Sequence, residues 1–210
     1  MSRYIRFALI LVVLGACPAF AQNVDTQVRL GLQVAAAEPE NHVGLAAWAL
    51  VPDATAAPFR SLFLGGVMLK ADGPLKPEPK RKAANRIQFL AGGFVGGGRF
   101  HPVLDSRLFL NFSGLDLYQE VVYVTSTNKV KLEQCLRKML HPGKAKFAVG
   151  VGSEIFVSGP FFAPARKSLY GVGPEVLVPI GSRLAVFIQY QFRNANRAGD
   201  MFRVNAVVSP

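Results

Sequence analysis

The sequence predicts an all-β protein: an antiparallel up-and-down β-barrel of eight to ten strands with one short amphipathic helix inserted. Apolar and polar side chains alternate with a period of two over most of the chain, which is typical of a sheet whose two faces differ chemically. Most of the alternating segments are close to the roughly 9–11 residues that a tilted strand needs to cross a bilayer. A single segment, residues 129–140, shows helical spacing instead.

Residues 1–21 have the features of a secretory signal peptide. Two arginines precede an apolar run, residues 7–14, and an Ala-Phe-Ala sequence ends at Ala21. We expect cleavage after Ala21, which leaves residues 22–210 as a single β-barrel domain. The apolar run is too short to cross a bilayer as a helix.

A lipoprotein signal is the alternative interpretation of this N-terminus. The sequence Leu-Gly-Ala-Cys ending at Cys17 would place a lipid on that cysteine. Cleavage after Ala21 would instead remove Cys17 and leave Cys135 as the only cysteine. No internal disulfide is then possible, so the sheet itself must supply the stability.

The composition is strongly basic, with 24 Lys and Arg against 13 Asp and Glu and a formal net charge of +11. Loss of the two signal-peptide arginines leaves 22 basic residues, and 22 − 13 gives +9. Such a charge favours anionic partners, such as lipid headgroups or lipopolysaccharide phosphates. A generally basic surface explains it equally well. Nucleic acid is not an expected partner of an exported chain, and the oligomeric state is left open.

Ten segments are predicted to be strands, or eight if the weaker ones fail. They are residues 27–34, 43–51, 61–70, 86–95, 107–112, 117–125, 147–158, 170–178, 184–193 and 202–208. Residues 72–84, rich in proline and basic side chains, are predicted to be an exposed loop. The alternation changes phase at Ser113-Gly114, which predicts a turn or a bulge there.

The segment 129–140 is predicted to be a helix outside the strand ladder. Its apolar residues recur at i, i+3, i+4, i+7 and i+8, which is one face of a helix. They are Leu132, Cys135, Leu136, Met139 and Leu140. His141-Pro142-Gly143 would end the helix. The helix would either close one end of the barrel or lie on a membrane surface.

The polar face of the strands carries the candidate functional residues. We expect a polar network in the lumen, with the apolar face directed to lipid. Its candidate members are Arg29, Glu154, Glu175, Gln189, Gln191, Arg193 and Arg203. Buried charges must be paired, so we expect Glu154 and Glu175 to pair with Arg193 or Arg203. Such a network would close the lumen, and the alternative is a narrow polar path or ligand pocket.

The chain resembles small outer-membrane β-barrel proteins of Gram-negative bacteria. The resemblance rests on the signal peptide, the alternating strands, the turn at residues 178–184 and the aromatic-ended strand at 187–192. It is a pattern over most of the mature chain rather than a signature motif. Members usually end in an aromatic residue, whereas this chain ends in Val207-Val208-Ser209-Pro210. The resemblance implies an outer-membrane location and contact with outer-membrane lipid.

Residues that would indicate enzymatic chemistry are few. None of the three histidines, His42, His101 and His141, belongs to a pair with metal-ligand spacing, and Cys135 has no second cysteine near it. His101-Pro102 is predicted to be a turn. No histidine has a serine two residues later, the spacing found in some outer-membrane lipid A hydrolases. We therefore predict no catalytic residue, no metal site and no cofactor.

Three functions are compatible with these patterns. The leading hypothesis is a non-enzymatic outer-membrane barrel, either structural or adhesive or a porin-like narrow passage for small solutes. The second is a soluble or lipid-anchored periplasmic barrel that binds a hydrophobic ligand. The third is a lipid-modifying outer-membrane barrel enzyme. An apolar stripe on the outside of the barrel favours the membrane, and one on the inside favours the soluble ligand barrel.

Overall fold

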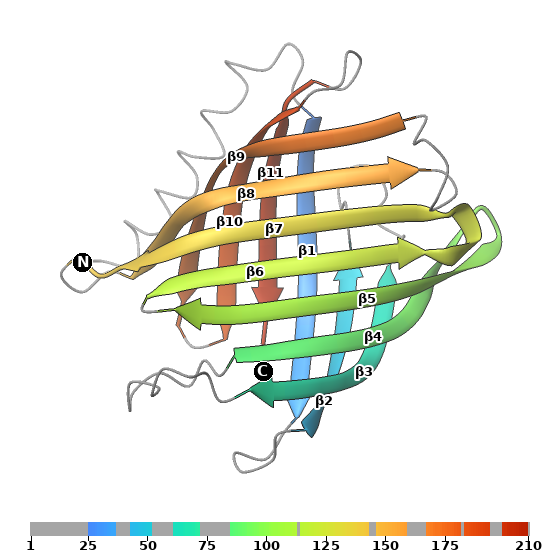
Figure 1. Ribbon diagram of the computed structural model, residues 1–210, viewed down its shortest axis with the longest axis horizontal. Helices are drawn as coiled ribbons and strands as arrows, with labels where there is room; N and C mark the ends of the chain where they lie inside the picture. The colour runs from blue at the N-terminus through green and yellow to red at the C-terminus, as the bar shows by residue number, and fades with distance from the viewer. Residues whose placement is uncertain are drawn as a thin grey trace.

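The computed structural model is a closed barrel of eleven strands that follow one another around the wall in chain order (Figure 1). It describes residues 25–36, 43–51, 61–71, 85–112, 114–142, 146–158, 167–181, 183–193 and 199–209. The predicted signal peptide, Cys17 and the predicted loop at residues 72–84 lie outside the described residues. The prediction of an all-β barrel is confirmed, whereas the predicted number of eight to ten strands is wrong.

Every predicted strand is present, and one further strand lies among them. The strands are β1 (Asp25–Ala36), β2 (Val43–Val51), β3 (Leu62–Ala71), β4 (Asn85–Gly96), β5 (Arg99–Phe112), β6 (Leu115–Val124), β7 (Lys129–Leu140), β8 (Phe147–Ser158), β9 (Lys167–Ile180), β10 (Leu184–Arg193) and β11 (Met201–Val208). A short 3-10 turn, η2 (Thr125–Thr127), connects β6 to β7. In the described part of the chain, no helix is long and apolar enough to cross a bilayer.

An odd strand number changes how the barrel closes. In a meander of eleven strands the first and last run in the same direction, so β1 and β11 pair in parallel while all other neighbours are antiparallel. The expectation of a wholly antiparallel barrel is therefore wrong at one seam, where β1 and β11 pair in parallel. β1 pairs with β11 through residues 25–32 and with β2 through residues 30–36, so neighbouring strands are offset along their length. This offset tilts the strands, as closure of a barrel requires.

The predicted helix at residues 129–140 is wrong, because this segment is strand β7. Glu133, Cys135 and Arg137 are buried, and the intervening Leu136 is 50% exposed, which is a strand alternation. Leu132, Leu136 and Leu140 follow one another at intervals of four residues. This interval places them on one face of a strand, because it is even, and also on one face of a helix, because it is close to one helical turn. In a barrel with a polar interior, such a stripe marks the outer face of a strand.

Two tight turns depend on glycine and define the ends of the barrel. Gly97 and Gly98, with φ of 57° and 73°, form the two-residue turn between β4 and β5, and such turns need positive φ at both positions. Gly114, with φ of 90°, lies in the predicted turn between β5 and β6 at the opposite end. We call these the Gly98 end and the Gly114 end. His101 and Pro102 were predicted to be a turn but lie within β5, since the chain has already reversed at Gly98.

The outer face of the barrel is apolar. Every one of the eleven strands places at least one large hydrophobic side chain on the surface, including Leu30, Phe63, Leu104, Val151 and Tyr170. The residues between them in each strand point inward, and on β6 to β11 many of these are polar or charged. On β6 to β11 the polarity is thus inverted relative to a soluble barrel, where apolar side chains fill the interior.

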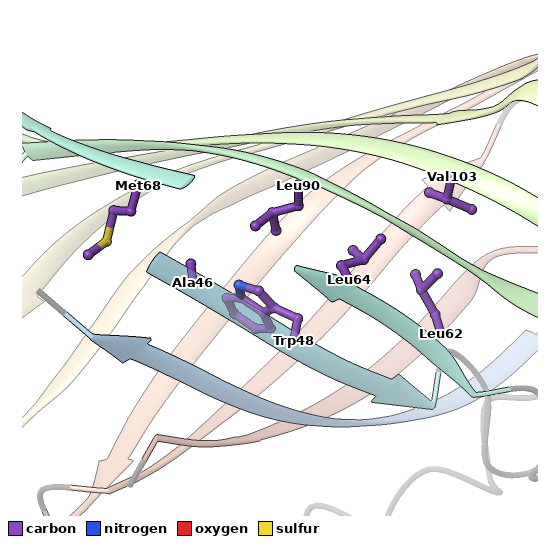
Figure 2. Packing of buried hydrophobic residues seen from close by; sticks show 7 residues of the cluster. All are labelled: Ala46, Trp48, Leu62, Leu64, Met68, Leu90 and Val103. Carbon is purple, nitrogen blue, oxygen red and sulfur yellow. The ribbon is translucent and has the colours of Figure 1, made fainter. Parts of the chain in front are cut away.

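A cluster of apolar side chains fills the lumen beneath β2 to β5. Figure 2 shows its members directed toward one another from these four strands. They are Ala46, Trp48, Leu62, Leu64, Met68, Leu90 and Val103. Fully buried Gln88 accepts a hydrogen bond from Trp48 Nε1 at 3.0 Å, which satisfies the indole within the cluster. One wall of the lumen is therefore apolar, and the polar groups gather against the others.

The assignment of β7 can be tested by cysteine labelling. In a background without Cys17 and Cys135, single cysteines at Gln134, Leu136 and Lys138 should react with a maleimide in the folded protein. The native Cys135, restored to the same background, should react only after unfolding, because its side chain is 1% exposed on the inner face of β7. Equal labelling at 134 and 135 in the folded protein would contradict the strand, as would protection with a period of three to four residues.

Candidate functional site

Eight charged side chains form one connected network in the lumen. Four are cations and four are carboxylates, so the network is neutral as a whole. The cations are Arg29, Arg107, Lys131 and Arg203, and the carboxylates are Asp105, Glu120, Glu133 and Glu154. They come from β1, β5, β6, β7, β8 and β11 and are almost entirely shielded from solvent.

The network is built on a row of three glutamates. Glu120, Glu133 and Glu154 occupy directly opposed positions on neighbouring strands β6, β7 and β8. Like charges facing each other in this way destabilise a sheet unless cations lie between them. Lys131 supplies one such cation, since its Nζ contacts Glu133 and lies 3.0 Å from Glu120 Oε2 and 3.8 Å from Glu154 Oε1.

Two arginines reach the glutamate row from the opposite wall of the barrel. Arg203 of β11 places Nη2 2.6 Å from Glu154 Oε2 and Nη1 3.7 Å from Glu133 Oε2. Arg29 of β1 places Nη1 3.3 Å from Glu133 Oε2 and Nη2 3.6 Å from Glu154 Oε1. These ion pairs cross the lumen, so they occupy the space through which a solute would have to pass.

Arg107 joins the network to the apolar cluster. Its Nη2 lies 2.7 Å from Asp105 Oδ2 and 2.9 Å from Glu120 Oε1. Its guanidinium also stacks on the Trp48 ring, 3.9 Å from the ring centroid. The planar guanidinium can make both contacts at once because it donates hydrogen bonds at its edge and stacks through its face.

A separate ion pair joins Arg137 and Glu175 on β7 and β9, the two strands that flank β8. The Cys135 thiol donates a hydrogen bond to Glu175 Oε2 at 3.1 Å. The Arg137 guanidinium lies 4.8 Å from the ring centroid of Phe187 and 5.8 Å from that of Tyr118. Each charge of this pair is thus buried with a partner, as a low-polarity interior requires.

The structure places the residues expected in the lumen as follows. Arg29, Glu154 and Arg203 belong to the eight-residue network, and Gln189 accepts a hydrogen bond from Arg203 Nη1 at 3.4 Å. Gln191 is fully buried nearby on β10. Arg193 ends β10 at the Gly98 end, where its Nη2 donates to Met201 Sδ at 2.7 Å.

Glu154 pairs with Arg203, as expected, but the expected partner of Glu175 is wrong because Arg137 takes that place. The sequence analysis also missed six charged residues: Asp105, Arg107, Glu120, Lys131, Glu133 and Arg137. Three of them lie on β7, which was assigned to a helix. Their signal was present, since Lys131, Glu133 and Arg137 all have the same odd parity.

A cavity of about 350 Å³ lies between the network and the Gly114 end. Four arginines line it, namely Arg29, Arg86, Arg107 and Arg137. Aromatic and aliphatic side chains form much of the remaining wall: Leu50, Trp48, Phe109, Leu117, Tyr118, Phe187 and Val207. The carboxylates of Asp116, Glu120, Glu133 and Glu175 complete the lining. The hollow thus combines apolar surface with convergent charged groups, and both are features of small-molecule sites.

A histidine and a serine meet at the Gly98 end. His101 Nε2 lies 3.1 Å from the Gly96 carbonyl oxygen, which can only accept a hydrogen bond, so Nε2 carries the proton. Nδ1 is then free to accept the Ser126 hydroxyl proton across 2.8 Å. The His101 ring is stacked on Phe94, with 4.9 Å between the centroids. This arrangement resembles a base oriented next to a hydroxyl nucleophile.

No protein-family model matches this chain, and no curated protein matches it. Within the described residues, no group of three or more His, Cys, Asp or Glu side chains is placed to hold a metal ion. The class that the structure itself defines is a closed eleven-stranded β-barrel with an apolar exterior and an ion-paired lumen.

The Arg203–Glu154 pair should show the energetics of a buried charge. Arg203→Gln or Glu154→Gln alone should destabilise the barrel by about 3–5 kcal/mol, because each leaves charge uncompensated in the lumen. The double variant keeps three cations with three carboxylates and should cost less than either single change. Urea unfolding in detergent micelles measures all three, with Arg99→Gln as a control at an exposed position. Equal losses in the singles and the double would contradict the pairing.

Proposed function

We propose that the protein is a non-enzymatic β-barrel of the Gram-negative outer membrane, with a structural or adhesive role and a lumen closed by ion pairs. The observation that carries the proposal is the inverted polarity of the wall. Large hydrophobic side chains are exposed on all eleven strands, while charged side chains such as Arg203 and Glu154 are 0% and 2% exposed inside.

Lipid explains this inversion and water does not. In water, an apolar band around the whole barrel would leave extensive hydrophobic surface exposed, which soluble monomers rarely do. In a bilayer the same band removes that surface from water, and closure of the barrel satisfies the backbone hydrogen bonds of every strand. A soluble barrel that binds a hydrophobic ligand would need the opposite arrangement, with the apolar parity inside.

The closed lumen favours a structural or adhesive role over a porin-like passage. Arg29 and Arg203 contact the glutamate row from the opposite wall, and Lys131 and Arg107 contact it from neighbouring positions. None of the eight network residues is exposed to solvent by more than a small fraction. A passage for solutes would require these pairs to separate. The predicted signal peptide and the basic charge of the mature chain fit export to a membrane with anionic headgroups.

The proposal predicts a depth-dependent cost of charge on the outer face. Val151 is 55% exposed and lies in the middle of β8. Val151→Arg should lower the free energy of unfolding in lipid vesicles by about 2–4 kcal/mol. Phe100 is 62% exposed at the Gly98 end, and Phe100→Arg should lower the free energy of unfolding by only about 0–1 kcal/mol. For a soluble barrel, both substitutions would be surface changes of roughly ±0.5 kcal/mol.

Envelope fractionation provides the matching test of location. The wild-type chain should collect with the outer membrane and should migrate differently on gels before and after heating, as a stable barrel resists unfolding by detergent. Recovery in the soluble periplasmic fraction, together with a neutral Val151→Arg, would overturn the membrane proposal in favour of the soluble barrel.

A second candidate function is favoured by the hydrogen bond between His101 and Ser126. With His101 Nδ1 as base, the Ser126 hydroxyl would attack an acyl ester at the rim of the barrel and form an acyl-serine. The ester C–O bond would break, the alcohol would leave with the proton held by His101, and water would then release the carboxylic acid, which is the chemistry of a lipid hydrolase. If this is correct, a fluorophosphonate should label the wild-type protein covalently, and Ser126→Ala and His101→Gln should both abolish labelling. Ser61→Ala, on the same end of the wall, serves as the control. An unlabelled wild type would exclude this function.

A further inference from the structure

Arg86 differs from the other three arginines of the cavity. Arg29, Arg107 and Arg137 each contact at least one carboxylate of the lumen. Among the residues that the structure describes, no carboxylate forms an ion pair with Arg86, and its buried Nε has no hydrogen-bond partner. The guanidinium instead stacks on Phe109, 4.2 Å from the ring centroid. Arg86 is half-buried, and a guanidinium that is partly withdrawn from water with a buried, unsatisfied Nε–H is costly, so this position is suited to an anion.

We propose that the cavity binds a small organic monoanion, a carboxylate carried on an apolar body, with Arg86 as its anchor. A carboxylate can accept two parallel hydrogen bonds from one guanidinium, which supplies the partner that Arg86 lacks. The apolar body then lies against the aliphatic and aromatic wall formed by side chains such as Leu117, Phe187 and Val207. The volume of about 350 Å³ accommodates a ligand of the size of a substituted benzoate.

The charges around the cavity limit the ligand to a single negative charge. Asp116, Glu120, Glu133 and Glu175 also line the cavity. The last three are already neutralised by Lys131, Arg29, Arg107 and Arg137. A second negative charge on the ligand would face these carboxylates without a free cation to offset it. A monoanion is therefore favoured over a doubly charged phosphate monoester.

The chain contains a built-in reporter for this site. Its only tryptophan, Trp48, lines the cavity, so a ligand that enters should change the fluorescence of one known residue. We expect benzoate to change Trp48 emission saturably in the full-length protein in detergent micelles. Benzamide has nearly the same shape without the charge, and it should produce no saturable change. The pair of probes thus separates recognition of charge from general partition into an apolar space.

Two variants and one control complete the test. Arg86→Gln should weaken benzoate binding by at least about tenfold, the loss expected for charge-assisted hydrogen bonds. Ala185→Phe places a ring in the cavity and should abolish binding while Arg86 remains. Arg99→Gln makes the same charge change at the Gly98 end and should bind benzoate as the wild type does. Circular dichroism confirms that each variant is folded.

The proposal is overturned if benzamide acts as benzoate does, if benzoate gives no saturable change, or if folded Arg86→Gln or Ala185→Phe binds as tightly as the wild type. Should Arg86→Gln fail to fold, Ala185→Phe still decides the matter. The site is enclosed by the barrel and lies near one end, so it does not depend on the membrane proposal. A soluble barrel that binds benzoate would contradict the membrane proposal alone. A membrane barrel that does not bind benzoate would contradict the ligand proposal alone.

Discussion

Charge balance inside the lumen is the constraint on which the rest of the structure depends. The opposed glutamates Glu120, Glu133 and Glu154 would repel one another across β6, β7 and β8 if they were alone. Lys131 lies beside them, and Arg29 and Arg203 reach them from the opposite wall. Since Arg29 and Glu133 are 104 positions apart in the chain, the network connects strands that are not neighbours in the sheet. The ion pairs therefore hold the barrel across its width, in addition to the hydrogen bonds around its wall.

The interior is divided into an apolar side and an ionic side, and Arg107 lies at the boundary. It stacks on Trp48 of the apolar cluster while it pairs with Asp105 and Glu120. Toward the Gly114 end the two sides separate enough to leave the cavity. Arg86 lies at this point with a ring contact in place of a carboxylate. Closure at the middle of the lumen and an accessible hollow near one end are thus compatible features of one interior.

Local periodicity explains both the success and the main error of the sequence-based predictions. Ten strands were predicted because each has an apolar outer face. Many inner residues of β1 and of β6 to β11 are polar or small, whereas β2 to β5 also direct apolar residues into the lumen. In β7, apolar residues at Leu132, Leu136 and Leu140 satisfy the helical and the strand period at once. The decisive signal was that the charged residues Lys131, Glu133 and Arg137 share one face of an extended strand. This signal indicates a strand only if the inside of the barrel is the polar side. Omission of β7 also removed half of the missed charged residues from consideration.

The sequence by itself determined which side chains share a face of each strand, because that depends only on the two-residue repeat of an extended backbone. It also indicated that Glu154 needs an arginine, since a buried carboxylate requires a cation. Only the tertiary structure decided which arginine serves each carboxylate, as the pairing of Glu175 with Arg137 rather than Arg193 or Arg203 shows. It also decided the parallel seam of β1 and β11 and the isolation of Arg86. These features depend on strand number, offset and curvature, which bring together residues from distant strands and are not encoded in any single segment.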